Sequence, residues 1–119
     1  MRDFIQTMKA LSDETRLRIL NLLLERECCV CEVMQALDIS QTRASRNLSA
    51  LYDAGFLKLR KDGIWSLYSI NRDAVEDYHS ALLDAVRKAL NGNETLDNDL
   101  EQLRKAKRIG PGCVKRVRK

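Results

Sequence analysis

Apolar side chains recur with the period of an α-helix through the N-terminal half of the chain. Residues 3–11 form a short apolar helical segment, and Ser12 is predicted to cap a second helix that runs to about Glu25. A third, short helix is predicted from near Cys29 to just before Asp38. The strong apolar stripe of the second helix predicts that this helix lies in the core.

The next segment changes its period from helical to alternating. Ser40 is predicted to cap a fourth helix that stops at Gly55, because glycine suits the left-handed conformation just past a helix end. Two helices separated by a short break predict a helix-turn-helix. Residues 56–60 then alternate, residues 61–63 form a turn, and residues 64–70 return as a strand. This hairpin is the predicted wing.

Two further helices are predicted after the hairpin. The first opens at Asn71 or Arg72 and carries an apolar stripe made of Val75, Tyr78, Leu82, Val86 and Leu90. A sixth helical stretch carries Leu96, Leu100 and Leu103. The predicted fold is mainly α with a β-hairpin, a winged helix-turn-helix over residues 1–92, followed by a C-terminal helical extension and basic tail over residues 93–119.

Composition restricts the class of protein. With 119 residues the chain is long enough for one core and a tail. No apolar run approaches the roughly 20 residues of a membrane span, and the N-terminus lacks a signal-peptide core, so we expect a cytoplasmic protein without a membrane partner. Residues 104–119 hold eight of the 21 basic residues and no acidic one, which leaves 13 basic against 17 acidic residues elsewhere. Positive surface must therefore be located residue by residue.

The fourth helix and the hairpin carry the candidate DNA contacts. If its apolar residues face inward, the helix presents Gln41, Thr42, Arg43, Ser45, Arg46 and Ser49 on its other side. Such side chains hydrogen-bond base edges and phosphates in a major groove, although an ordinary solvated face has a similar composition. The hairpin adds Lys58, Arg60 and Lys61, which suit either phosphate contact or protection of a sheet edge. Trp65 is predicted to pack within the wing or core.

Three of the four cysteines are Cys28, Cys29 and Cys31, a spacing that disfavours structural disulfides between them. Clustered reduced thiols select soft metals and metalloids, whereas the alternative is that they are small buried apolar side chains. On an ideal helix, residues two apart point about 200° apart. We therefore expect that Cys29 and Cys31 can grip one ion only if the first turn of the third helix deforms.

The segments ALSDETRLRILNLL, ECCVCEV, LDISQTRASRNLSAL and GFLKLRKDGIWSLYSI together resemble the ArsR/SmtB family of metal- and metalloid-responsive repressors, over about residues 5–90. The resemblance implies a transcriptional repressor, not an enzyme, that trivalent arsenic or antimony releases from its DNA operator. It also implies a homodimer formed by the first and last helices, although the apolar stripes of these helices also suit closure of the core of a single chain. A two-fold dimer would set its recognition helices about 34 Å apart on an inverted repeat.

The sensing residues follow the arsenic-responsive members only in part. Cys29 and Cys31 match their CVC positions, but Met34 stands where those members usually have a third cysteine. Cys28 or Cys113 must supply a third thiolate if three are used. His79 matches half of a zinc site found in some members, and because the other half is missing we expect a solvated or interface histidine.

Other functions remain open from the sequence. The same scaffold suits a repressor that responds to cadmium or lead, or one that responds to thiol oxidation or persulfides. A winged helix used only for protein interaction is a third alternative. An enzyme is the least favoured class, because the single histidine has no evident nucleophile partner and no phosphate-binding glycine loop occurs.

Overall fold

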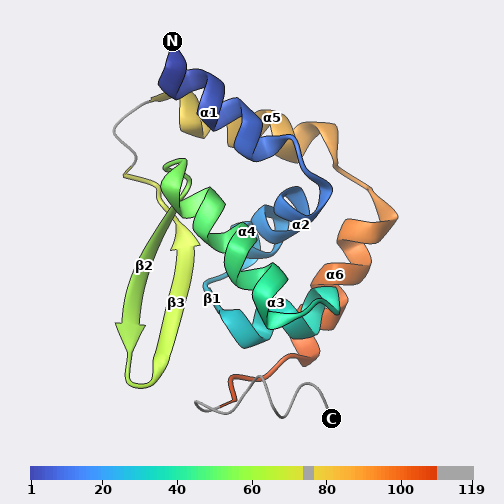
Figure 1. Cartoon of the computed structure of the whole chain (residues 1–119). Helices are drawn as coiled ribbons and strands as arrows, with labels where there is room; N and C mark the ends of the chain where they lie inside the picture. The colour runs from blue at the N-terminus through green and yellow to red at the C-terminus, as the bar shows by residue number, and fades with distance from the viewer. Residues whose placement is uncertain (74–76, 110–119) are drawn as a thin grey trace.

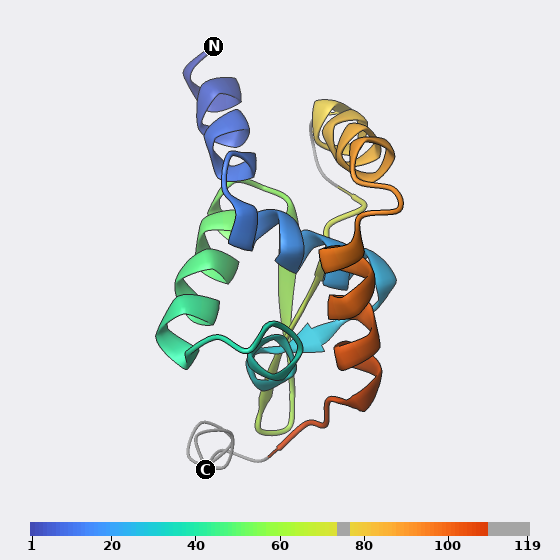
Figure 2. The same ribbon diagram turned by 90° about the vertical axis from the view of Figure 1, so that its right-hand side faces the viewer.

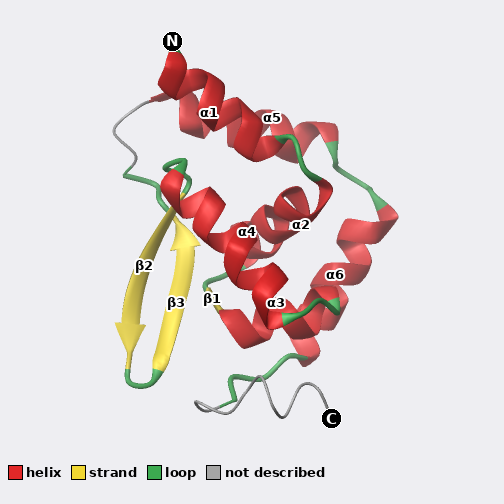
Figure 3. Ribbon diagram, viewed as in Figure 1, coloured by secondary structure: helices red, strands yellow, loops and turns green. Residues whose placement is uncertain are grey.

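Six helices and three strands make up the part of the chain that the computed structural model describes, residues 1–73 and 77–109 (Figures 1 and 3). In chain order they are α1 (Arg2–Leu11), α2 (Glu14–Glu25), β1 (Cys28–Cys29), α3 (Val30–Leu37), α4 (Gln41–Asp53), β2 (Leu57–Asp62), β3 (Trp65–Ile70), α5 (Asp77–Ala89) and α6 (Glu94–Lys105). The predicted winged helix-turn-helix is confirmed, with α3 and α4 as the helix pair and β2 and β3 as the wing. None of the described helices is both long and apolar enough to cross a bilayer.

The wing is longer than predicted, and a third strand, β1, joins its sheet. β2 continues to Asp62, which pairs with Trp65, so the turn is Gly63 and Ile64 instead of residues 61–63. Gly63 has φ +60, a conformation that glycine adopts without strain. The sheet order is β1-β3-β2, all antiparallel. Strand β1 was not predicted, because two residues are too few to show an alternating pattern.

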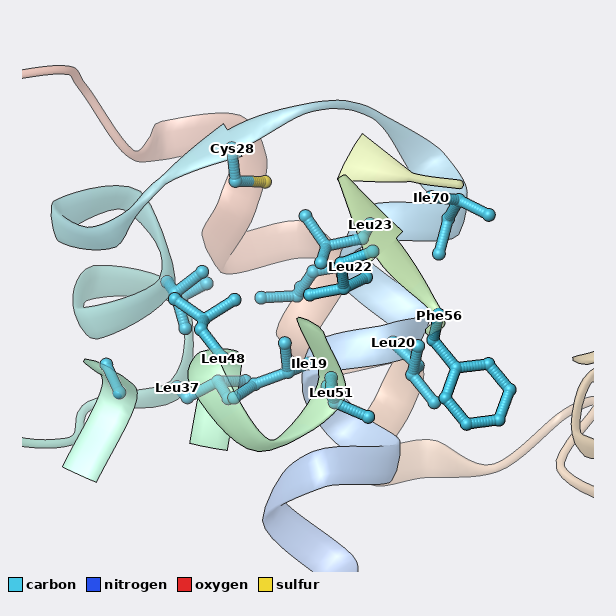
Figure 4. Packing of buried hydrophobic residues seen from close by; sticks show 14 of the residues in the cluster. Ile19, Leu20, Leu22, Leu23, Cys28, Leu37, Leu48, Leu51, Phe56 and Ile70 are labelled. Atoms are coloured by element: carbon cyan, nitrogen blue, oxygen red, sulfur yellow. The ribbon is translucent and has the colours of Figure 1, made fainter. Parts of the chain in front are cut away.

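The core lies between α2, α3, α4 and the base of the wing (Figure 4). Ile19, Leu20 and Leu22 of α2 are fully buried, as the predicted stripe requires. They pack with Leu48 and Leu51 from α4, among other apolar side chains of the same cluster. This packing fixes α4 by its inner face and leaves its outer face available.

Two predicted helix starts are wrong. Asp13, not Ser12, caps α2, because its carboxylate accepts a hydrogen bond from the Arg16 backbone N–H at 3.0 Å. Ser12 instead ends α1, where its hydroxyl donates to the carbonyl of Met8 at 3.2 Å. Residues 71–73 form a turn, in which the Asp73 N–H donates to the Asn71 side chain, so neither Asn71 nor Arg72 opens α5. Val75, predicted for the α5 stripe, lies outside the described residues.

α6 packs against α2 and α3 and is part of the same core. Its buried Leu103 joins the core cluster. The buried Asp99 carboxylate accepts two hydrogen bonds from the Arg18 guanidinium, each 2.8 Å long, which ties α6 to α2. Figure 2 shows α6 running along the body of the molecule instead of projecting from it. The position of α6 brings the residues that follow it close to the start of α3.

α1 and α5 lie at the opposite end of the molecule from the hairpin turn (Figures 1 and 2). Phe4, Ile5 and Met8 of α1 are each more than two fifths exposed. The Phe4 ring meets the Tyr78 ring of α5 edge to face, at a centroid distance of 5.1 Å. This end of the molecule therefore carries an exposed apolar surface.

Candidate functional site

The outer face of α4 carries the polar residues that the sequence singled out. The Ser40 hydroxyl accepts the Arg43 N–H at 3.1 Å, which confirms the predicted cap. Thr42, Arg46 and Ser49 are exposed, whereas Ala44 faces the core. Together they form the open face that contact with a DNA groove requires.

Three other candidates on α4 are partly engaged within the molecule. The Gln41 amide donates to the Ser45 hydroxyl at 3.0 Å, one turn along the helix. The Arg43 guanidinium donates to the Thr15 hydroxyl at 2.8 Å, which directs it toward α2. Base contact by Gln41, Ser45 or Arg43 would require these bonds to be exchanged, while Arg46 makes no such bond to any described residue.

The wing cations are exposed and differ in their partners. Lys61 donates to the Ser66 hydroxyl across the hairpin at 2.6 Å. Lys58 lies 3.9 Å from the exposed Asp73 carboxylate. Arg60 is held more firmly, because its guanidinium donates two hydrogen bonds to Glu27 at 2.9 and 2.7 Å. The hydrogen bond from Arg60 lowers the pKa of Glu27, so the pair is charged on both sides at neutral pH.

The clustered cysteines are free thiols, and all three are buried. Cys28 and Cys29 are consecutive residues of β1 and therefore point to opposite sides of the sheet. Cys28 packs into the main core, as Figure 4 shows, whereas Cys29 belongs to a small cluster with Cys31 and Leu67. The structure thus brings Cys29 and Cys31 together and leaves Cys28 on the other side. Met34 also lies in the main core.

The Cys29 and Cys31 sulfur atoms lie 3.0 Å apart. The expectation that they diverge by 200° is wrong, because Cys29 is not helical: it is the extended residue that precedes α3, with φ −88 and ψ 168. From that position its side chain turns back toward the first turn, where Cys31 lies. We name these two residues the dithiol pair. It is formed without any deformation of α3.

The buried Glu32 carboxylate holds the backbone of Cys29 in place. One carboxylate oxygen accepts the Cys29 N–H at 2.9 Å and Arg108 Nε at 3.0 Å, and the other accepts from Arg26 at 2.8 Å. Burial alone would raise the pKa of Glu32, but these hydrogen bonds outweigh it and lower the pKa. Because cationic and N–H donors already surround it, Glu32 is a positioning residue for Cys29.

Sequence reasoning missed Glu32, although a signal for it exists. The pattern Cys29-x-x-Glu32 has the spacing of a capping box, with cysteine in place of serine or threonine, and both of its hydrogen bonds form. No local pattern, in contrast, pointed to Arg108, which lies 76 positions from its partner Glu32.

Burial keeps Cys28 and Cys29 protonated at neutral pH. It raises the pKa of Cys28 to about 12. It also raises the pKa of Cys29, and the hydrogen bond with Cys31 adds to this effect. Within residues 1–73 and 77–109, no three cysteine, histidine or carboxylate side chains converge on one point. Cys113, the other predicted thiolate, lies outside the described residues.

His79 is buried, so the solvated alternative is wrong, whereas a place at a dimer interface stays a prediction. Its Nε2 lies 2.8 Å from the carbonyl oxygen of Ala54, at the end of α4, and its ring stacks on Tyr78. It also meets Phe56 edge to face at 5.0 Å. His79 therefore joins α5 to the end of α4.

Comparison with known proteins gives one family. A family model described as bacterial regulatory protein, arsR family, matches residues 13–58. An arsenical resistance operon repressor of Escherichia coli is 48% identical over 68 residues, which cover 56% of this chain and 58% of that protein. An arsenical resistance operon repressor of Bacillus subtilis is 34% identical, over 63% of this chain and 72% of its own length.

Solved structures agree with the fold. The homodimeric winged helix-turn-helix DNA-binding domain of Mb0332 from Mycobacterium bovis, a possible ArsR-family regulator, superposes with a TM-score of 0.64. It is 28% identical, and the match covers 78% of this chain and 82% of that domain. The likeness therefore extends over most of both chains.

Proposed function

Because this chain belongs to the ArsR family of bacterial regulatory proteins, we propose that it is a homodimeric transcriptional repressor that trivalent arsenic or antimony releases from DNA. The observation that carries the proposal is the dithiol pair, two buried sulfurs 3.0 Å apart, of which Cys29 lies on the strand that pairs with the wing and Cys31 lies in the first turn of α3. Soft thiolate ligands of this kind select soft acceptors.

The burial of the dithiol pair favours an uncharged metalloid over a cation as its ligand. Arsenite at neutral pH is an uncharged trihydroxide. Two S–H groups condense with two As–OH groups to give two S–As bonds and two water molecules, so no proton is released and no charge enters the buried site. A divalent cation such as cadmium must instead displace the thiol protons.

Cys113 is the third thiolate that we propose, in preference to Cys28. The Ile109 N–H lies 3.5 Å from the Cys31 sulfur, and Cys113 follows Ile109 by four residues. Four residues span up to about 14 Å when extended, so the Cys113 thiol of the same chain is within reach of the pair. Cys28 faces the other side of β1, in the main core.

The dithiol pair and the residues next to it in the chain contact both DNA-binding elements. Cys29 pairs with Leu67 of β3, and Glu27 holds Arg60 of β2. Cys31 lies in α3, which packs on α4. Binding at the dithiol pair therefore acts on both DNA-binding elements. A typical coupling of about 1 to 3 kcal/mol would weaken operator binding roughly 5- to 150-fold.

DNA reading is assigned to the outer face of α4 and to the wing. We propose that Arg46, Thr42 and Ser49 contact base edges or nearby phosphates, with Gln41, Arg43 and Ser45 joining them after exchanging their internal bonds. Lys58, Arg60 and Lys61 contact the phosphate backbone.

One such unit reads few base pairs, so we propose a dimer on an inverted repeat. The exposed Phe4, Ile5 and Met8 on α1, beside α5, supply the apolar surface for it. The Mycobacterium bovis domain, similar in fold, is homodimeric. A single species with the mass of a monomer at micromolar concentration would contradict this part of the proposal.

Selection of bound duplexes from a random pool, at fixed salt, tests DNA reading and supplies an operator. Fluorescence anisotropy of the selected duplex then follows release during separate titrations with arsenite, antimonite, cadmium and zinc. We expect an inverted repeat among the selected sequences and release by arsenite and antimonite at lower concentrations than cadmium. Absence of any selected sequence, or release by zinc alone, would refute the proposal.

The short sulfur–sulfur distance favours oxidation as a second candidate signal. Hydrogen peroxide would take two electrons and two protons from the dithiol pair, giving a disulfide and two water molecules. Peroxide-driven release from the same duplex, in a metal-free buffer and reversed by a thiol reductant, would support this alternative.

A further inference from the structure

The residues that follow α6, 106–109, lie across the beginning of α3; we call them the strap. The Gln35 amide donates to the Lys107 carbonyl at 2.8 Å and accepts the Lys107 N–H at 3.1 Å. Arg108 donates to the buried Glu32 carboxylate at 3.0 Å. The strap is therefore held by side chains of α3 at two consecutive residues.

The far end of the strap lies between the dithiol pair and the wing. The Ile109 N–H donates to the Cys31 sulfur at 3.5 Å, and the Ile109 carbonyl accepts a 2.8 Å hydrogen bond from Trp65 Nε1. Figures 1 and 2 show this segment running from the lower end of α6 toward the hairpin. One backbone segment thus contacts both the sulfur and the first residue of β3.

The strap also covers the sulfurs. Cys29 and Cys31 are 2% and 1% exposed, and they share a cluster with Leu67, Trp65 and Ile109. Of these five, Trp65 and Ile109 are the members that keep contact with solvent. Trp65 and Ile109 therefore form the partly exposed side of this apolar cluster.

We infer that the strap is the movable cover of the dithiol pair, and that displacement of Ile109 by a bound ligand releases Trp65 and so signals to the wing. At 3.5 Å the Ile109 nitrogen and the Cys31 sulfur are in contact, which leaves no room for a further atom between them. In this inference, an atom bonded to both sulfurs takes part of the space that Ile109 fills, so Ile109 moves and Trp65 loses its acceptor. The identity of the ligand rests on the proposed function, whereas the role of the strap as a cover does not.

Site-resolved alkylation of the full-length chain with N-ethylmaleimide, followed by mass spectrometry, tests the cover. Gln35→Leu removes both bonds to Lys107, and Arg108→Gln removes the ion pair with Glu32. Each should speed alkylation of Cys29 and Cys31 by about tenfold, the effect of one or two lost hydrogen bonds. The matched control is Arg104→Gln, which breaks an exposed pair with Glu101.

Cys28 is the internal reference, because it lies in the main core, away from the strap. Rates at Cys29 and Cys31 that stay equal in the wild type and in both strap variants would overturn the inference. An equal acceleration at Cys28 would do the same, because it would indicate general loosening of the fold.

Trp65, the one tryptophan of the chain, reports the signal to the wing. During titration with sodium arsenite, its fluorescence emission should change in proportion to the arsenic that remains on the desalted protein. Bound arsenic with unchanged emission would overturn the inference and leave the proposed function intact. Absence of bound arsenic, together with faster alkylation in the strap variants, would refute the proposed inducer and support the cover.

Discussion

Cys28 and Cys29 are adjacent in the sequence, yet they belong to two different regions of the molecule. Cys28 faces the main core, packed among apolar side chains from α2, α3 and α4. Cys29 faces the other side of β1, where it meets Cys31 below the strap. Both are at most 2% exposed, so burial alone does not distinguish them.

The contrast shows that the neighbours of a thiol, and not its burial, decide what it can do. Cys28 has as its polar contact the Arg26 carbonyl, at 3.5 Å, and acts as a small apolar side chain. The Cys29 sulfur lies 3.0 Å from the Cys31 sulfur, close enough for both to bind one atom. The Cys29 backbone N–H is held by the Glu32 carboxylate. Substitutions at these residues and their neighbours separate the two roles.

Replacing either member of the dithiol pair should have the largest effect. Cys29→Ser or Cys31→Ser removes one of the three proposed sulfur ligands, so arsenite should bind more than about 100-fold more weakly, since thiolate chemistry selects it. Operator affinity without arsenite should stay within about threefold of the wild type. Anisotropy titrations measure both, with Cys28→Ser as the matched control. Full release of the double variant by arsenite would contradict the assignment.

Cadmium and arsenite should differ in their dependence on pH. Burial raises the pKa of Cys29, so its thiol is protonated throughout the neutral range. Cadmium must displace that proton, so its affinity should rise by at least about tenfold per pH unit, or at least about 100-fold from pH 6 to pH 8. Arsenite condenses with release of water, so its affinity should change little. Competition titrations at fixed ionic strength measure both; parallel pH profiles would contradict the prediction.

Cys28→Ser should affect stability instead of sensing. It places a hydroxyl in an apolar site with a single nearby acceptor, so the free energy of unfolding should fall by about 1 to 3 kcal/mol. Urea unfolding measures the change, and the arsenite titration should match the wild type. A variant of full stability that no longer responds to arsenite would place Cys28 in the sensing site and reverse the comparison.

The smallest effect is expected at Glu27, the solvent-facing neighbour of Cys28. Glu27→Gln removes the charge that holds Arg60, which frees the guanidinium for a phosphate. Operator affinity should rise by about two- to fivefold, with a salt dependence steeper by about one phosphate contact. Glu25→Gln, at an exposed residue of α2, controls for the change in net charge. Weaker binding by Glu27→Gln would mean that the ion pair positions the wing.

The periodic parts of the fold were predictable from the sequence. Repeating apolar positions identified α2, α4 and α6, and Ser40 and Gly55 marked the ends of α4 because their backbone roles depend on local chemistry. Errors arose where two local signals compete. Both Ser12 and Asp13 can cap a helix, and only the path of the chain from α1 decides between them.

The residues of the candidate site were predictable from the sequence, but their arrangement in space was not. Cys29 and Cys31 stood out by composition, and the polar residues of α4 by their position opposite the apolar stripe. That Cys29 lies in a strand, and not in the first turn of α3, depends on pairing with Leu67, 38 positions away. Pairing over such a distance leaves no local periodic trace.

The side chains that could bind soft ligands and the helix that could read DNA are identifiable from the sequence, because both follow from residue type and local period. Which thiols meet depends instead on how distant segments of the chain pack together. The sheet pairing of β1 turned two adjacent cysteines to opposite faces, and α6 carried the strap over one of them. Contacts of this kind form when remote segments bury surface together, so no single segment contains the information.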